Sequence, residues 1–180
     1  MQSLHSICRW TFNAGKGGFV PGDMRPEWSS KNLSTADSIR LVKDKIYPRL
    51  PKHVDLGFEM HYDTEFNEKN ADEITEALVE TGIYLSIITP GAHSHFAYGG
   101  ICSLDPNERK AAQEMGERCV DLGYGALKKA WHPQADLAPT LVLWNGSYGY
   151  DLATVGIKQM YQHLKENVAK LCPYENKKGG

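Results

Sequence analysis

Hydrophobic residues along this chain of 180 residues occur in two alternating patterns. Short β-branched and aromatic runs predict strands at residues 5–12, 54–60, 83–88 and 140–144. Each run precedes a stretch whose apolar residues recur every three or four positions, which predicts a helix after every strand. These helices are expected at residues 35–47, 68–81, 105–130 and 154–171, the last ended by Pro173. Four successive βα units predict an α/β fold with a parallel sheet.

Four βα units are half of the number in a closed (β/α)8 TIM barrel. The polar tail from Glu175 to Gly180 stands where a fifth strand would be expected to follow. We therefore expect residues 1–180 to form one domain, the N-terminal (β/α)4 half of a TIM barrel that stops before strand five.

Composition excludes several classes of protein from this expectation. The formal net charge is −2, and the Lys and Arg residues are scattered, which disfavours binding to nucleic acid or to an anionic membrane. No stretch approaches the roughly 20 apolar residues of a membrane span, and the first residues do not resemble a signal peptide. A cytoplasmic protein is expected. The four cysteines are far apart, so free buried thiols are expected rather than a zinc site.

Candidate catalytic residues follow the second predicted strand. In parallel barrels the C-terminal ends of the strands meet at one mouth, where the chemistry takes place. His61 lies at such an end, and Asp63 follows closely enough to hold its ring in one tautomer. We therefore predict His61 as a proton shuttle, oriented by the carboxylate of Asp63. The alternative is a purely structural histidine.

A sugar-binding wall is predicted from aromatic residues at other strand ends. Trp10 and Trp144 follow strands one and four, and large rigid rings offer an apolar surface to the C–H face of a sugar. The alternative is that both tryptophans are packed in the hydrophobic core. The segment after strand three should face the same space and adds the remaining candidate substrate contacts, Thr89, His93, His95 and Phe96. Because no carboxylate or cysteine stands at ligand spacing beside His93 and His95, we predict no metal site from this chain alone.

Several motifs resemble, in order, the first half of xylose isomerase. They extend over most of the chain and comprise Arg9-Trp10-Thr11-Phe12, Gly22-Asp23-Met24-Arg25-Pro26, Glu59-Met60-His61-Tyr62-Asp63, Ser94-His95-Phe96, Val120-Asp121-Leu122 and Leu143-Trp144-Asn145-Gly146. The resemblance implies a (β/α)8 enzyme that interconverts an aldose, such as xylose, and a ketose. It also implies that Trp10 and Trp144 line the sugar pocket and that His61 opens the sugar ring.

The resemblance further implies partners and cofactors. Phe19 falls near an aromatic residue that the family inserts into a neighbouring subunit, so a homo-oligomer is expected. The family holds two divalent ions, Mg²⁺, Mn²⁺ or Co²⁺, with ligands from strands five to eight. Those ligands are absent from this chain, so the isolated chain is expected to be inactive in sugar isomerisation until a C-terminal half completes it.

Two other functions remain open from the sequence. The chain could be a non-catalytic half-barrel that binds a partner or a second copy through its open sheet edges. It could also belong to a related barrel epimerase, which keeps the fold and changes the reaction.

Overall fold

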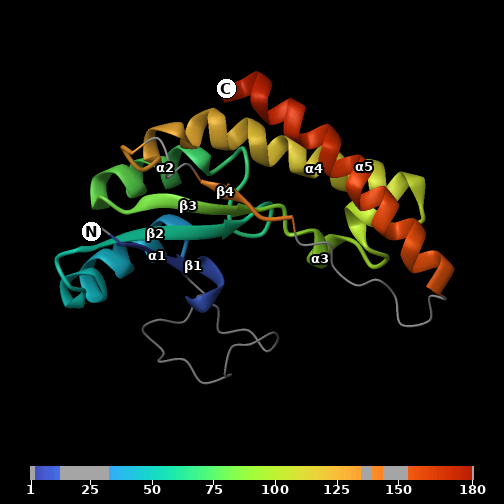
Figure 1. Cartoon of the computed structure of the whole chain (residues 1–180). Helices are drawn as coiled ribbons and strands as arrows, with labels where there is room; N and C mark the ends of the chain where they lie inside the picture. Colours follow the sequence, from blue (N-terminus) through green and yellow to red (C-terminus); the bar gives the residue numbers. More distant parts are fainter. Residues whose placement is uncertain (1–2, 13–32, 135–138, 144–153, 180) are drawn as a thin grey trace. The chain divides into compact units, whose positions relative to one another are not determined.

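The computed structural model describes four stretches of the chain, residues 3–12, 33–134, 139–143 and 154–179. They form a four-stranded parallel sheet with helices between the strands (Figure 1). The strands lie in the order β1 (Ser3–Cys8), β2 (Val54–His61), β3 (Tyr84–Thr89) and β4 (Thr140–Leu141). The predicted α/β class and parallel sheet are therefore confirmed. In the described residues no helix is both long enough and apolar enough to cross a membrane.

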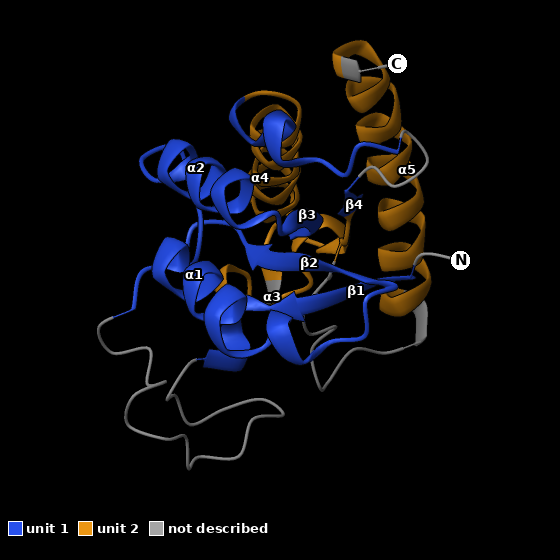
Figure 2. Ribbon diagram, turned by 90° about the vertical axis from the view of Figure 1, so that its left-hand side faces the viewer, with its two compact units in different colours: residues 1–88, 126–140 blue, residues 89–125, 141–180 orange. Residues whose placement is uncertain are grey.

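The chain divides into two compact units, coloured separately in Figure 2. Unit 1 comprises residues 1–88 and 126–140, and unit 2 comprises residues 89–125 and 141–180. Strands β1, β2 and nearly all of β3 belong to unit 1, together with helices α1 (Thr35–Lys45) and α2 (Ala71–Thr81). Unit 2 holds α3 (Ala92–His95), α4 (Pro106–Tyr124) and α5 (Thr154–Gly179). Each unit is described by itself below.

The first strand is shorter than predicted. β1 spans Ser3–Cys8, and the residues Arg9–Phe12 form a short 3-10 helix rather than a continuation of the strand. Arg9 and Phe12 are both buried. Residues three apart share one side of a 3-10 helix but lie on opposite faces of a strand, so the turn is what buries both side chains together. Trp10 therefore lies in a turn just after β1.

β2 spans Val54–His61 and pairs with β1 in parallel, with Ser3 opposite Val54 and Cys8 opposite Glu59. Its alternate residues Leu56, Phe58 and Met60 are buried and apolar. Because side chains alternate along a strand, Asp55, Gly57, Glu59 and His61 share the opposite face. The predicted strand was thus correct, and His61 is its last residue.

α1 begins and α2 ends where the sequence predicts, but α1 stops at Lys45 rather than residue 47 and α2 starts at Ala71 rather than residue 68. α1 spans Thr35–Lys45, and Ser34 caps it in a capping box with Asp37. α2 spans Ala71–Thr81 and ends at Gly82, whose φ of 66° lies in the left-handed region that glycine adopts without strain. The two helices lie side by side (Figure 2). They bury apolar residues that include Ile39, Val42, Ile74 and Leu78.

Gly57 allows a contact over the middle of the sheet. β3 spans Tyr84–Thr89, and the hydroxyl groups of Ser6 on β1 and Ser86 on β3 are 2.7 Å apart. A Cβ atom at Gly57 would lie 2.5 Å from the Cβ of Ser86. Only glycine leaves room for this serine pair, because real Cβ contacts are longer.

Two helices of unit 2 end at other residues than the sequence predicts. α4 spans Pro106–Tyr124, with Asp105 as its cap, and does not reach Ala130. Gly125 leaves the helical conformation, and residues Ala126–Ala130 form a 3-10 helix that belongs to unit 1. α5 spans Thr154–Gly179, so the prediction that Pro173 ends this helix was wrong.

Contacts with α4 account for the extra turns of α5. Tyr174 donates its hydroxyl hydrogen to Asp121, and the ammonium group of Lys178 lies 2.8 Å from the same carboxylate. Tyr124 bonds Glu175 in the same stretch. A proline inside a helix removes one backbone hydrogen bond, and these side-chain contacts compensate for that loss.

The remaining elements are short. α3 spans Ala92–His95 and a 3-10 helix spans Gly100–Cys102, both within the segment predicted as a loop. β4 spans Thr140–Leu141. Its predicted extension to Trp144 falls outside the described residues.

Candidate functional site

The candidate site lies at the C-terminal ends of β1 and β2. Register places Cys8 of β1 opposite Glu59 of β2, and His61 follows Glu59 on the same face. His61 is 8% exposed. The sequence therefore predicted correctly that His61 ends a strand of the parallel sheet, which is where α/β proteins hold their reactive groups.

A tight turn after β2 brings a carboxylate back to His61. The carbonyl oxygen of His61 accepts hydrogen bonds from the backbone N–H groups of Glu65 and Phe66, at 3.0 and 3.2 Å. Asp63 completes the turn with a φ of 69°, and its N–H donates to the carbonyl of Phe66. The turn therefore returns the side chain of Glu65 to the end of the strand that it has just left.

Glu65 is the carboxylate that bonds the His61 ring. Its Oε2 accepts the backbone N–H of His61 at 2.8 Å and lies 3.1 Å from Nδ1 of the same residue. The Glu65 side chain is only 6% exposed. Because an ionised carboxylate can only accept, the hydrogen of a neutral His61 ring lies on Nδ1, and Nε2 is the basic nitrogen.

Sequence reasoning missed Glu65. It assigned the orienting role to Asp63, two residues after His61, whereas the bonded carboxylate comes four residues after it. The sequence does show Glu65 as one of the acids in the polar stretch between the strand and α2. Only the conformation of the turn shows which of these acids contacts the His61 ring. Asp63 is exposed, and a catalytic role for it stays a prediction.

Arg9 adds a buried positive charge to the site. Its guanidinium group donates a hydrogen bond of 2.8 Å to the carbonyl of Leu33, and the residue is 6% exposed. Burial lowers the pKa of Arg9, and the negative charge of Glu65 acts in the opposite direction. The charge of Glu65 therefore acts on the guanidinium of Arg9, which places both charges at the same end of the sheet.

The thiol of Cys8 bonds a second carboxylate at the same strand ends. Its Sγ donates to Oε2 of Glu59 at 3.0 Å. Burial, the hydrogen bond to Glu59 and the charges of Glu59 and Glu65 raise the pKa of Cys8 to about 12, against a smaller lowering by a hydrogen bond with Trp10. Cys8 is therefore a neutral thiol at physiological pH and is not a nucleophile. Trp10, Glu59 and the charge of Glu65 thus all act on the Cys8 thiol at the end of β1.

The other predicted substrate contacts belong to unit 2 or lie outside the described residues. Thr89 is 1% exposed at the end of β3, and its hydroxyl has no partner in the part of the chain that the structure describes. His93 and His95 lie on α3, with His95 exposed. Phe96 packs against the unit 2 core of Ile101, Ala112 and Leu171, and so has a structural contact. Trp144 and Phe19 lie outside the described residues.

A second pair of histidine and carboxylate lies at the opposite end of β2. Nε2 of His132 is 3.3 Å from Oδ2 of Asp55, and its Nδ1 accepts the backbone N–H of Gln134 at 3.2 Å. The ring also packs edge-on against Tyr84, the first residue of β3, with the ring centres 4.5 Å apart. Nε2 therefore ties the chain after Ala130 to the start of the sheet, and Nδ1 bonds the backbone two residues further along that segment.

The described residues hold no group of three or more His, Cys, Asp or Glu side chains arranged to bind a metal ion. The pair of divalent ions that the resemblance implies thus finds no set of ligands in this part of the chain.

No family model matches the chain, and no curated protein matches it significantly.

Proposed function

We propose that this chain is the sugar-binding half of a (β/α)8 enzyme that interconverts aldoses and ketoses, with His61 as the group that opens the sugar ring. The parallel sheet in sequence order, with helices between strands, supports this proposal because it is the arrangement of half a barrel. Completion of the barrel, the oligomer and the divalent ions remain parts of the proposal.

The observation that carries the proposal is the contact between His61 and Glu65. A ring nitrogen fixed by a buried carboxylate leaves a neutral imidazole with a defined basic nitrogen. The carboxylate also stabilises the imidazolium that forms when the ring accepts a proton. This pair is therefore suited to move a proton to and from a hydroxyl group.

Opening of a cyclic aldose needs that kind of proton transfer. Nε2 of His61 takes the proton of the anomeric hydroxyl group, and the electron pair of that O–H bond forms the carbonyl at C1. The bond between C1 and the ring oxygen breaks, and the ring oxygen accepts the proton back from the imidazolium or from water. The product is the open-chain aldehyde, and His61 regains its neutral form.

Hydride transfer between C1 and C2 would need the divalent ions, which polarise the carbonyl and hydroxyl oxygens of the open chain. Because the described residues offer no fitting set of ligands, we assign no such step to them. Ring opening is the part of the chemistry that His61 and Glu65 carry.

Polarimetry of freshly dissolved α-D-xylose tests this function, because ring opening is the slow step of mutarotation. The full chain should accelerate mutarotation, and His61→Asn should reduce the acceleration by about 100-fold or more. The side-chain amide of asparagine can still donate to Glu65, so the fold should persist, as circular dichroism would show.

His163→Asn is the matched control. His163 also lies beside a glutamate, with its Nδ1 3.7 Å from Glu166, but it is a partly buried residue of α5 in unit 2, outside the candidate site. Its replacement should leave mutarotation unchanged. A wild-type chain without acceleration, or an equal acceleration by a folded His61→Asn variant, would overturn the ring-opening role.

A further inference from the structure

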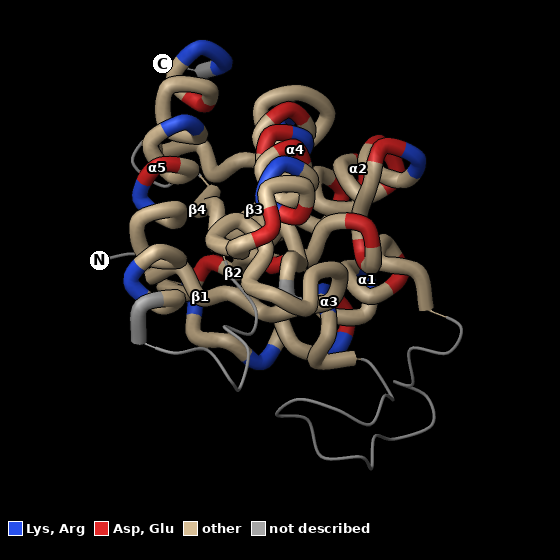
Figure 3. Tube along the Cα trace, turned by 90° about the vertical axis from the view of Figure 1, so that its right-hand side faces the viewer, with Lys and Arg blue, Asp and Glu red and all other residues tan. Residues whose placement is uncertain are grey.

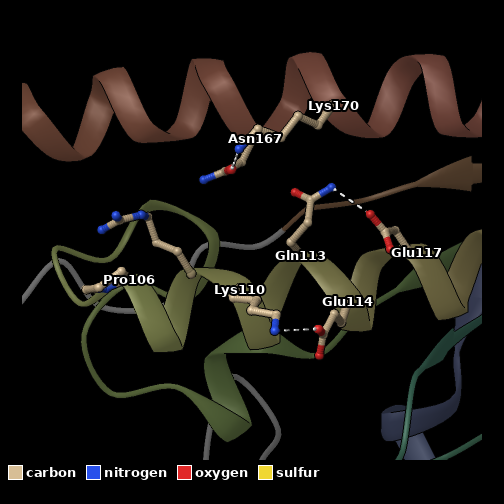
Figure 4. A pocket seen from close by; sticks show the side chains of 8 residues that line it. Pro106, Lys110, Gln113, Glu114, Glu117, Asn167 and Lys170 are labelled. Atoms are coloured by element: carbon tan, nitrogen blue, oxygen red, sulfur yellow. Dashed lines mark hydrogen bonds and ion pairs between the residues drawn. The ribbon is translucent and has the colours of Figure 1, made fainter.

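A polar pocket lies between α4 and α5, entirely within unit 2 (Figure 4). Its volume is about 380 Å³. From α4 it is lined by Arg109, Gln113 and Glu117, which follow one another at intervals of four residues on one face of the helix. From α5 it is lined by Asn167 and Lys170. The pocket is thus a space between two helix faces, large enough for a small metabolite.

The pocket contains a buried acceptor that has no donor. Nε2 of Gln113 donates to Oε1 of Glu117 at 3.3 Å, which sets the orientation of the amide. Oε1 of Gln113 is buried and has no hydrogen-bond partner in the stretches that the structure describes. A buried carbonyl oxygen without a donor is unfavourable, and such groups are rare in folded proteins. A bound molecule with a hydroxyl group would satisfy it.

Two cations of the pocket are held in place without a carboxylate partner. Nη1 of Arg109 donates to the carbonyls of Ser103 and Leu104, at 2.6 and 2.9 Å. Nζ of Lys170 donates to Oδ1 of Asn167 at 3.0 Å. Within the described residues, neither Arg109 nor Lys170 forms an ion pair. These neutral acceptors position both charges without neutralising either of them.

Asn167 makes the α5 side of the pocket rigid. It is only 6% exposed, and its Nδ2 donates to the carbonyl of Ile101 at 2.8 Å. One side-chain amide therefore fixes both the core of unit 2 and the position of Lys170. Preorganised polar groups of this kind lower the entropic cost of binding a ligand.

The charge around the pocket is mixed, with a positive excess where the ligand would lie. Figure 3 shows acidic and basic residues interleaved along α4 and α5. The remaining lysine, Lys110, lies 3.8 Å from Glu114 and is paired. Among the lining residues there are three cations and two carboxylates, so the excess is one positive charge.

We propose that this pocket binds a small hydroxylated anion, a carboxylate or phosphate ester with at least one hydroxyl group. The anionic group lies between the guanidinium of Arg109 and the ammonium of Lys170, and a hydroxyl group donates to Oε1 of Gln113. Glu117, which holds the Gln113 amide, stays outside the anion's contacts. The site is independent of the proposed function of His61.

Isothermal titration calorimetry of the full chain tests this site with four probes. D-Gluconate and glycerol 3-phosphate both carry hydroxyl groups, but the first is a carboxylate and the second is a phosphate ester. Acetate lacks the hydroxyl groups and glycerol lacks the anion. We expect at least one of the first two to bind about tenfold or more tightly than acetate and glycerol, and more weakly as salt is added. Which one binds identifies the anion.

Gln113→Leu separates a ligand site from a structural role. The substitution removes a buried acceptor without a partner, so the free energy of unfolding should stay the same or rise. Affinity for the hydroxylated anion should fall about tenfold or more. Gln162→Leu is the matched control, because Gln162 donates in the same way to Glu166 four residues later, but on the exposed surface of α5.

Lys170→Gln should likewise weaken binding about tenfold, whereas the exposed Lys165→Gln should not. Equal affinity of wild type and Gln113→Leu, or no preference for either hydroxylated anion over acetate and glycerol, would overturn the proposal.

Discussion

Two buried pairs of histidine and carboxylate stand at the two ends of β2, and they differ in what holds the ring. At the C-terminal end, the carboxylate of Glu65 fixes His61 through Nδ1. At the N-terminal end, His132 meets Asp55 through Nε2 and accepts the N–H of Gln134 at Nδ1. His132 also packs on Tyr84. Both histidines are 8% exposed, so burial does not distinguish them.

The difference shows that a histidine beside a carboxylate is not enough to identify a reactive site. The bonds of His132 connect the chain after the 3-10 helix of residues 126–130 to the first residues of β2 and β3. These contacts hold two segments of the fold together, which is a structural role. His61 has its carboxylate on the turn that leaves the strand, at the end of the sheet where parallel α/β folds expose functional groups. We therefore expect substitutions at His61 and Glu65 to change activity and substitutions at His132 to change stability.

The largest effect is expected from Glu65→Gln. A neutral amide still fits the turn but no longer stabilises the imidazolium, so the acceleration of mutarotation should fall about tenfold or more. Polarimetry measures the rate, and circular dichroism checks the fold. Asp63→Asn is the matched control, because Asp63 is an exposed acid of the same turn. A loss with Asp63→Asn and none with Glu65→Gln would return the orienting role to Asp63, as the sequence alone predicted.

An intermediate effect is expected from His132→Gln. Removal of the ring leaves Asp55 and the N–H of Gln134 without their partner and removes the packing on Tyr84, which should lower the free energy of unfolding by about 1–3 kcal/mol. Urea denaturation measures this change. Mutarotation by the folded variant should equal that of wild type. A folded variant of unchanged stability but reduced activity would make the two ends of β2 functionally alike.

Local signals explain which parts of the fold the sequence predicted well. The capping box of Ser34 and Asp37, the glycine at residue 82 and the cap at Asp105 act within a few residues, and each helix boundary that depends on them was correct. Pro173 is also a local signal, but contacts of α5 with Asp121 and Tyr124 on α4 override it. Such contacts join residues about 50 positions apart and leave no pattern in the sequence.

The same distinction applies to the site. The end of a strand is visible in the sequence, so His61 could be placed there before the structure was known. Glu65 could not be identified in this way, because Asp63, Glu65 and Glu68 all lie in the segment between His61 and α2. Only the backbone hydrogen bonds of the turn decide which of these acids reaches the His61 ring. The pairing of Cys8 with Glu59 depends on the register of β1 and β2, which joins residues 51 positions apart.

The smallest effect concerns the thiol beside the His61 end of β2. The pKa of Cys8 rises from its ordinary value of 9.0 to about 12, mainly through burial and then through Glu59. Stability that depends on the neutral thiol is therefore present below pH 9 and is lost between about pH 9 and 12, because the unfolded chain releases its proton first.

Glu59→Gln removes a negative charge and should lower this pKa, so alkylation of Cys8 by iodoacetamide should begin at a lower pH than in wild type. Mass spectrometry of the cysteine peptides measures this, with the exposed Cys172 as the internal control. An unchanged pH dependence would mean that burial alone keeps the thiol neutral, and that Glu59 is not electrically coupled to the strand end that holds His61.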